Sequence, residues 1–419
     1  MGWDSQEGRP LTWQYTRNSV LKYDVRILHI IGLWPLAGSR LYRCLVAVFF
    51  SLSLGNFTEA VINLCTLHGY LEDFTLALSN ASFVIVGALK VTFFLRNESG
   101  YCRLVRWLDA LVASQREHIR GRLQLEDIFT GAQSLAMRLT RGFFMYNASI
   151  VLTWVLVPLT APPEAKRLPF QQLPLTEDSP FSVYALSYVL QGVSMLWIAL
   201  ISVQMDCFFT AAMIHATSQL RILSSIIADL QLGNGDQKLQ EKVSLDSMYK
   251  ELRLCIQAHQ EITRFVDHLE SVMNPIAMMQ LAVGVFNGCM LIFPATYSSE
   301  NDALLKCVIA APTISAQLLL YCLGAHSVRE QGEAVSLGAY SCGWQDASAG
   351  FRRALLVVMA RAQKPLTLTA GGIYPIQRAT FLSAKRGFAL TQKDACTAAF
   401  KPAVQNDIKH PRKDTAGKD

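Results

Sequence analysis

The sequence predicts an all-α membrane protein whose amino terminus lies in the cytoplasm. Three observations lead to this fold class. The 419 residues are 51% hydrophobic and only 17% charged, which is too apolar for an ordinary soluble protein of this size. Six long stretches are nearly free of charge, and each is long enough for a helix to cross the ~30 Å hydrocarbon core. The segments that connect these stretches are alternately rich and poor in Lys and Arg along the chain.

The six apolar stretches predict membrane-spanning helices because each holds about 20 mainly apolar residues. Lys90 interrupts the second stretch near its cytoplasmic end, and we expect its side chain to snorkel to the membrane interface. After the sixth stretch the hydropathy weakens, so a seventh span is marginal by this criterion. The stretches cover residues 41–64, 74–95, 142–160, 181–205, 271–299 and 303–327.

The distribution of basic residues predicts the orientation, because Lys and Arg are retained on the cytoplasmic side of a membrane. Residues 1–43 hold six of them, residues 96–141 hold eight and residues 206–270 hold six. The link at residues 65–73 holds none, and the link at residues 161–180 holds two. The amino terminus is therefore expected inside, which is the reverse of a G-protein-coupled receptor.

Residues 206–270 predict long helices on the cytoplasmic side. Apolar residues such as Leu220, Leu223 and Ile227 recur there at helical spacing. A Gly-Asn-Gly sequence at residues 233–235 divides the segment into two runs. We therefore expect the fourth and fifth spans to continue into the cytoplasm and to form an intracellular helical assembly.

Several classes of function are disfavoured. The net charge of +6 comes from basic residues scattered between apolar stretches, so no nucleic acid is expected as a partner. The ten cysteines contain no C-x-x-C pair, and His215 and His259 lack a second ligand at helical spacing. No metal or cofactor site is expected. No sequence motif of a known catalytic centre occurs, so we do not expect an enzyme.

Aromatic and polar residues gather in the predicted outer halves of the spans. An apolar cavity with a few hydrogen-bonding groups is what a small volatile organic ligand needs. Ordinary helix packing and interfacial aromatic residues explain the same pattern, so both interpretations stay open. The candidate ligand-binding residues are Phe83, Tyr146, Trp154, Tyr184, Tyr188, Gln191, Met195 and Thr313.

The carboxy-terminal part of the chain carries a long and specific motif. Residues 339–344 read AYSCGW, residues 351–356 read FRRALL, residues 359–366 read MARAQKPL, and residues 368–375 read LTAGGIYP. Together with GLWP at residues 32–35, these segments closely resemble the signature of insect odorant receptors.

The resemblance implies a seven-transmembrane-helix bundle with a cytoplasmic amino terminus. Its long inner helices would form an intracellular anchor domain. Such a subunit assembles with the shared odorant-receptor coreceptor as a heterotetramer around a central pore. A small volatile odorant opens a non-selective cation path lined by the last helix. The implied location is the plasma membrane of olfactory sensory neurons, with the chain crossing the bilayer several times.

The resemblance also assigns regions and residues in this chain. Residues 1–40 form a cytoplasmic segment, and residues 41–327 hold spans one to six, with cytoplasmic helical extensions at about 206–270. Residues 328–365 form an anchor helix, residues 366–400 form an atypical pore helix, and residues 401–419 form a disordered tail. The implied pore residues are Ile376, Thr380, Ser383 and Thr391. The implied subunit-anchor residues are Tyr340, Trp344, Arg352, Arg361 and Pro365.

The sequence departs from the family pattern after Ser383. Where the family continues with a largely apolar helix, this chain carries charges that include Lys393 and Asp394, and charge at membrane depth is tolerated only beside water or a partner. A non-conducting splice or gene-model variant is therefore one alternative. A gustatory receptor of the same superfamily is a second. A metabotropic seven-helix receptor, from a different class, is a third.

Overall fold

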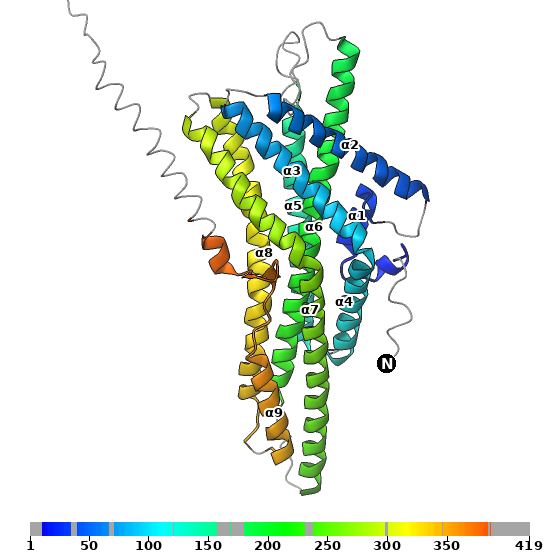
Figure 1. Cartoon of the computed structure of the whole chain (residues 1–419). Helices are drawn as coiled ribbons and strands as arrows, with labels where there is room; N and C mark the ends of the chain where they lie inside the picture. The colour runs from blue at the N-terminus through cyan, green and yellow to red at the C-terminus, as the bar shows by residue number, and fades with distance from the viewer. Residues whose placement is uncertain are drawn as a thin grey trace, which may run out of the picture.

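Helices make up nearly the whole of the described chain in the computed structural model (Figure 1). The structure describes residues 11–34, 40–66, 71–119, 121–156, 168, 180–230, 238–297, 301–345, 347–383 and 386. The helices are η1 (Tyr15–Arg17), α1 (Lys22–Ile31), α2 (Arg40–Thr66), α3 (Leu71–Arg96), α4 (Glu98–Ile119), α5 (Leu123–Leu156), α6 (Phe181–Ala228), α7 (Lys238–Tyr297), α8 (Asn301–Ser341) and α9 (Ala349–Ala362). Two short strands follow, β1 (Thr369–Ala370) and β2 (Tyr374–Pro375).

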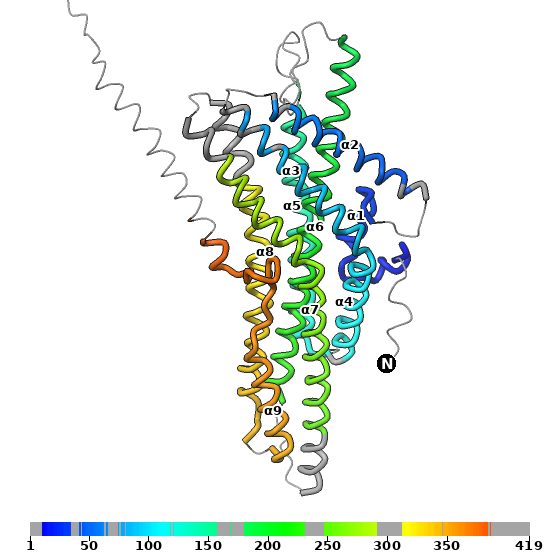
Figure 2. The backbone as a smooth tube through the Cα atoms, in the orientation of Figure 1, coloured from blue at the N-terminus to red at the C-terminus, as the bar shows by residue number. Residues whose placement is uncertain are grey.

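Three long helices, α6, α7 and α8, lie side by side through the length of the bundle (Figures 1 and 2). α6 has 48 residues and α7 has 60. At ~1.5 Å per residue these helices are about 70 Å and 90 Å long, more than twice the ~30 Å hydrocarbon core. The helices at spans four and five are thus as long as predicted, while their extension into the cytoplasm stays a prediction.

Four stretches within the described residues are long and apolar enough to cross a membrane. They are Cys44–Ile62, Ala77–Arg96, Phe181–Ala228 and Ser247–Met290, and they coincide with or overlap the first, second, fourth and fifth predicted spans. The third and sixth predicted spans fall on α5 and α8, which are not among these four. The count of seven spans and the cytoplasmic amino terminus stay predictions.

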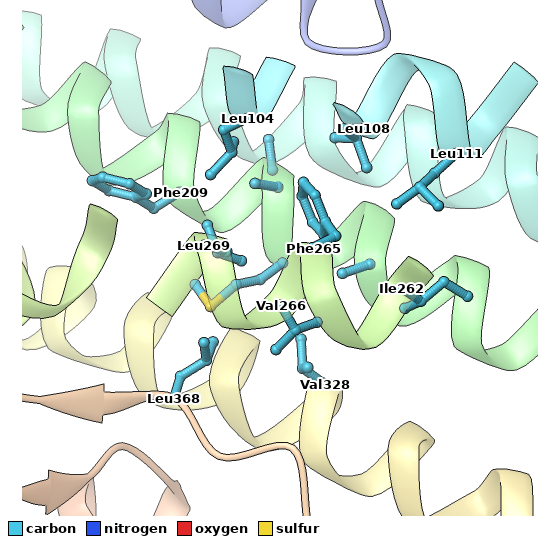
Figure 3. Packing of buried hydrophobic residues seen from close by; sticks show 14 of the residues in the cluster. Leu104, Leu108, Leu111, Phe209, Ile262, Phe265, Val266, Leu269, Val328 and Leu368 are labelled. Atoms are coloured by element: carbon cyan, nitrogen blue, oxygen red, sulfur yellow. The ribbon is translucent and has the colours of Figure 1, made fainter. Parts of the chain in front are cut away.

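One hydrophobic core includes residues of the predicted spans and of the inner helices. Figure 3 shows part of this core from close by. α4 contributes one apolar face to it, and α7 packs against that face at helical spacing. Burying each such Leu, Ile or Phe side chain stabilises the fold by about 1.5–3 kcal/mol. The side chains labelled in Figure 3 are Leu104, Leu108, Leu111, Phe209, Ile262, Phe265, Val266, Leu269, Val328 and Leu368.

The amino-terminal helix α1 is fixed to the bundle by the residues that end it. Gly32 has a φ of +102°, a left-handed conformation that a glycine adopts without steric cost. The turn brings the fully buried Trp34 ring against Phe94, Tyr101 and Phe208, with ring centroids 5.2, 6.3 and 5.7 Å away. Gly32 and Trp34 therefore anchor α1 to α3, α4 and α6.

A carboxylate on α4 holds the segment that precedes α1. One Asp109 carboxylate oxygen accepts hydrogen bonds from the Val20 N–H at 2.8 Å and from the Ser19 hydroxyl at 3.1 Å. Burial raises the pKa of Asp109 to about 6. The amino-terminal segment is thus attached by hydrogen bonds as well as by apolar packing.

Glycines on α8 allow α8 to pack closely against α6. A Cβ atom on Gly338 would lie 2.6 Å from the backbone oxygen of Ser224, and one on Gly324 would lie 2.6 Å from the Met213 methyl carbon. The Ser224 hydroxyl also donates to the Ala334 carbonyl at 3.1 Å. The two backbones therefore approach at distances that no larger residue at position 338 permits.

The predicted anchor helix over residues 328–365 is divided in the structure. α8 ends at Ser341, and α9 begins at Ala349 after a turn. The Ser348 side chain caps α9 by accepting a hydrogen bond from the Phe351 N–H at 3.2 Å. A serine that caps the start of α9 favours a new helix there over one continuous helix.

The predicted pore helix also begins differently. Residues 369–375 form an antiparallel hairpin, with Thr369 opposite Pro375, and only from Arg378 is the chain helical. Gly371 and Gly372 in the turn have φ values of +66° and +69°, so this segment cannot be helical. The predicted tail at residues 401–419 lies outside the described residues.

Replacing Gly338 with Ala is expected to destabilise the protein, because the new Cβ meets the backbone oxygen of Ser224 as well as its hydroxyl, and the backbone cannot move aside as a side chain can. The expected cost is about 1–3 kcal/mol. Gly131→Ala on α5 is the control, since a Cβ there has no atom within 4 Å, and it should be neutral or slightly stabilising. The measurement is the melting temperature of the detergent-purified chain by fluorescence-detected size exclusion. Equal melting temperatures for the two variants would contradict the close approach.

Candidate functional site

Four of the eight predicted ligand-binding residues lie along α6. Tyr184, Tyr188, Gln191 and Met195 are spaced by three or four residues, so they share one face of the helix. The Tyr184 and Tyr188 rings lie 5.9 Å apart. The Tyr188 hydroxyl donates to the carbonyl of Val155 on α5. The structure thus brings this face of α6 next to the part of α5 that carries Trp154.

Gln191 is buried and connects α6 to α2. Its Nε2 donates to Glu59 Oε1 at 2.9 Å, while its Oε1 has no hydrogen-bond partner among the described residues. Three positions further along α6, the Ser194 hydroxyl accepts a hydrogen bond from the Asn56 amide. Gln191 therefore has a structural role and also retains one acceptor for a ligand.

Phe83 and Met195 lie on the two sides of the α3–α6 interface. α3 and α6 approach closely where Gly87 faces Ile198, since a Cβ on Gly87 would collide with that side chain. Phe83 and Met195 are each one turn away from this point on their own helices. Met195 is buried and Phe83 is half-buried.

The remaining predicted ligand-binding residues differ in their surroundings. Thr313 follows Pro312 on α8, and its hydroxyl oxygen is buried without a hydrogen-bond partner among the described residues. Tyr146 lies on α5 with 39% of its surface exposed, and Trp154 is half-buried. An unpaired buried hydroxyl costs about 1–3 kcal/mol, so Thr313 is the residue with most to gain from a polar ligand.

Beyond this region, toward the cytoplasmic ends of the predicted spans, a buried ion pair joins three helices. Lys90 Nζ on α3 lies 2.6 Å from Asp206 Oδ1 on α6, and both side chains are 0% exposed. Lys90 also donates to the Ser202 hydroxyl at 3.0 Å, and the Tyr321 hydroxyl on α8 donates to the same Asp206 oxygen at 2.8 Å. The expectation that Lys90 snorkels to the membrane interface is therefore wrong, because a carboxylate is available within the bundle.

A second buried carboxylate lies on the amino-terminal helix. Asp24 Oδ1 on α1 accepts from the Thr140 hydroxyl on α5 and from Gln204 Nε2 on α6, both at 3.0 Å. Burial raises the pKa of Asp24 to about 6, and these two hydrogen bonds oppose that shift. Gln204 and Asp206 are about 200° apart around α6. The two groups therefore fasten opposite faces of this helix.

These polar contacts are the part of the site that local sequence patterns missed. Besides the two carboxylate groups, Ser82 on α3 donates to Asn287 on α7, and Gln280 on α7 donates to Gln317 on α8 at 2.9 Å. The available signal was a polar residue inside an apolar stretch. That signal marks a position but does not identify its partner.

The predicted pore residues fall into three groups. Ile376 and Thr380 are buried against α7 and α8, with exposed fractions of 7% and 4%. Ser383 is exposed at the end of the short helix that follows the hairpin. Thr391 lies outside the described residues.

The predicted anchor residues lie on the surface around α9, apart from Trp344, which is half-buried. Arg352, Arg361 and Pro365 are exposed, and Tyr340 has 61% of its surface exposed. The Trp344 Nε1 donates to the Tyr340 carbonyl at 3.1 Å. Large apolar side chains of α8 and α9 are also exposed there, namely Leu337, Leu356 and Val357.

Lys90→Met is expected to destabilise the chain by about 3–5 kcal/mol, because it leaves the Asp206 carboxylate buried without its counter-charge. The double variant Lys90→Met/Asp206→Leu should recover most of this loss, since neither buried charge remains. Lys250→Met at an exposed position of α7 is the control. Melting temperatures of the purified variants measure the effect, and a double variant less stable than Lys90→Met would contradict the ion pair.

Comparison with known proteins agrees with this arrangement. A family model described as 7tm Odorant receptor matches residues 70–387. Odorant receptor Or2 of Anopheles gambiae is 23% identical over 371 residues, which are 87% of this chain and 89% of the relative. Odorant receptor 22c of Drosophila melanogaster is 24% identical over 358 residues, which are 81% and 87% of the two chains.

Solved structures agree on the fold. The insect olfactory receptor OR5 from Machilis hrabei in complex with eugenol superposes with a TM-score of 0.71 at 16% identity. The match covers 92% of this chain and 99% of that one. At this identity the likeness concerns the fold alone. Since the family model matches well over half of the sequence, this chain belongs to the insect odorant receptor family.

Proposed function

We propose that this chain is the odorant-recognising subunit of a ligand-gated, non-selective cation channel that works with the shared coreceptor. The observation that carries the proposal is the family match over residues 70–387. The proposed location is the plasma membrane of olfactory sensory neurons. The proposed topology has seven spans and a cytoplasmic amino terminus, which is supported by the alternation of basic residues along the sequence.

The proposed odorant site lies between the outer halves of α3, α5, α6 and α8. Its supporting features are the aromatic face of α6, the free Gln191 acceptor and the unpaired Thr313 hydroxyl. Apolar burial would supply most of the binding energy, at about 25 cal/mol per square ångström. A small volatile molecule buries little area, so we expect modest affinity and selectivity set by cavity shape.

Opening of the channel is proposed to be a shift between two arrangements of the bundle. An odorant favours the open arrangement only to the extent that it binds that arrangement more tightly than the closed one. The exposed apolar surface around α9 supports assembly into a tetramer, because a monomeric soluble surface rarely carries so many large apolar residues together.

A second candidate function is that of a folded subunit that does not conduct. The observation that favours it is the charged sequence after Ser383, where Lys393 and Asp394 replace a largely apolar run in the family. Charges at that depth would have to face water or a partner. In this case the odorant site could fold normally while the pore would not.

The two candidates are separated by recording odorant-evoked current from the chain expressed with the coreceptor. The comparison is a version whose residues after Ser383 are replaced by an apolar helix of the family type. Alcohols, aldehydes and esters of six to ten carbons serve as probes, with coreceptor-only cells as the baseline. Current from both forms supports a conducting subunit, and current from the repaired form alone supports the non-conducting variant. No current from either form would contradict both candidates.

Thr313→Val is expected to weaken activation by odorants that carry a hydroxyl or carbonyl group. The variant keeps the side-chain shape and removes one hydrogen bond, which is worth about 0.5–1.5 kcal/mol, or about 2- to 10-fold in half-maximal concentration. Thr153→Val at an exposed position of α5 is the matched control. Dose–response curves in the conducting form measure the effect. Equal curves for the two variants would exclude Thr313 from the site.

A further inference from the structure

The Tyr321 side chain lies between α6, which carries half of the candidate odorant-binding residues, and the start of the segment assigned to the pore. We infer that Tyr321 is a positioning residue that couples odorant occupancy on α6 to the chain that follows β2. This inference rests on the proposed channel function and names the route by which occupancy of the odorant site reaches the pore segment.

The first step is the continuity of α6. Gln191 and Asp206 lie on one uninterrupted helix, 15 residues or about 22 Å apart at ~1.5 Å per residue. The helix is buried on most of its faces over the second half of this interval. A ligand that shifts or rotates the outer part of α6 therefore also displaces Asp206.

The second step is the discrete bonding of Asp206. Its Oδ1 accepts both the Lys90 ammonium at 2.6 Å and the Tyr321 hydroxyl at 2.8 Å. Its Oδ2 has no hydrogen-bond partner among the described residues. Removing the partners of a buried carboxylate lowers the stability of the folded protein by several kcal/mol. Asp206 therefore either moves Tyr321 with it or exchanges one set of bonds for another.

The third step is the position of Tyr321 beside the pore segment. Together with Ile376 and Thr380, its side chain lines a cavity of about 10 Å³, the space of about one water molecule. Hydrogen bonds fix these two residues, since the Ile376 N–H donates to the Leu368 carbonyl at 2.9 Å and the Thr380 hydroxyl donates to the Pro375 carbonyl at 2.8 Å. Movement of the Tyr321 ring is thus transmitted to the first turn of the helix that begins at Arg378.

Farther along α8, Arg329 also contacts the pore segment. Arg329 Nη1 donates to Gln377 Oε1 at 3.1 Å, and Arg329 also pairs with Glu333 at 2.9 Å. These groups are partly exposed, so their hydrogen bonds are weaker than those around Asp206. Of these two links from α8 to the pore segment, the one at Tyr321 is also bonded to α6, through Asp206.

Tyr321→Phe tests the inference because it removes the hydroxyl and keeps the ring in the lining of the cavity that Ile376 and Thr380 share. Tyr101→Phe is the matched control, since Tyr101 is also buried and its hydroxyl has no partner among the described residues. Each variant is expressed as the full chain with the coreceptor, in the form that conducts for the unsubstituted chain. The readouts are the ratio of odorant-free to maximal current, the half-maximal concentration and the surface expression.

We expect Tyr321→Phe to change the current ratio by at least about fivefold, which corresponds to ~1 kcal/mol in the opening equilibrium. Tyr101→Phe should leave this ratio unchanged. Thermal stabilisation of the purified chain by the same odorant should be retained in both variants, which separates coupling from binding. Asp206→Asn should alter the current ratio as well. Adding Tyr321→Phe to it should then have little further effect.

The outcomes are distinguishable. If the unsubstituted chain responds and Tyr321→Phe behaves like Tyr101→Phe, the coupling role of Tyr321 is wrong and the proposed function stands. If neither form of the unsubstituted chain responds, the proposed function fails and this inference fails with it. If Tyr321→Phe loses surface expression and stability together with its current, the side chain is structural and the coupling role is rejected.

Discussion

The structure depends on the requirement that polar groups buried inside an apolar bundle find partners there. α6 carries this constraint most clearly. Asp206 on one face binds Lys90 of α3 and Tyr321 of α8, and Gln204 on the other face binds Asp24 of α1. Leaving any one of these groups unpaired costs more than a typical apolar contact gains. The relative positions of the surrounding helices are therefore fixed by bonds to α6 as well as by packing.

The pairing of α6 with α8 extends this constraint along the bundle. Contacts at Asp206 and Tyr321, at Met213 and Gly324, and at Ser224 and Gly338 follow one another along both helices. The two helices consequently run parallel from the predicted membrane region into the inner helical region (Figure 1). A displacement at one end of such a helix pair also displaces the other end, because close-packed interiors are hard to compress and transmit strain.

The candidate odorant site and the candidate assembly surface lie at opposite ends of this pair. The outer part of α6 carries aromatic residues with a few unsatisfied polar atoms, which suits a small ligand bound mainly by apolar burial. The surface around α9 exposes large apolar side chains such as Leu356 and Val357, which suits contact with other subunits. Between the two lies the hairpin of β1 and β2, which contacts α7 and starts the segment assigned to the pore.

The sequence by itself determined the features that depend on local composition. The apolar stretches predicted the spans that α2, α3, α6 and α7 provide, and the helical spacing around Leu220 predicted the inner extension of α6. The motif at residues 339–375 predicted the family. These predictions succeed because they depend only on a short segment of sequence. Its apolar length decides whether it can cross a membrane, and the spacing of its apolar residues shows whether it is helical.

Only the tertiary structure decided which distant residues meet. Lys90 and Asp206 are 116 residues apart, and Asp206 and Tyr321 are 115 apart, so no local pattern links them. The cost of burying a charge depends on whether a partner is present. Local composition does not show the distant partner, and it therefore favoured a lysine that snorkels to the interface. The hairpin at residues 369–375 and the break between α8 and α9 also interrupt segments predicted as continuous helices. Their geometry is set by glycines with positive φ and by a capping serine, whose effect depends on the contacts around them.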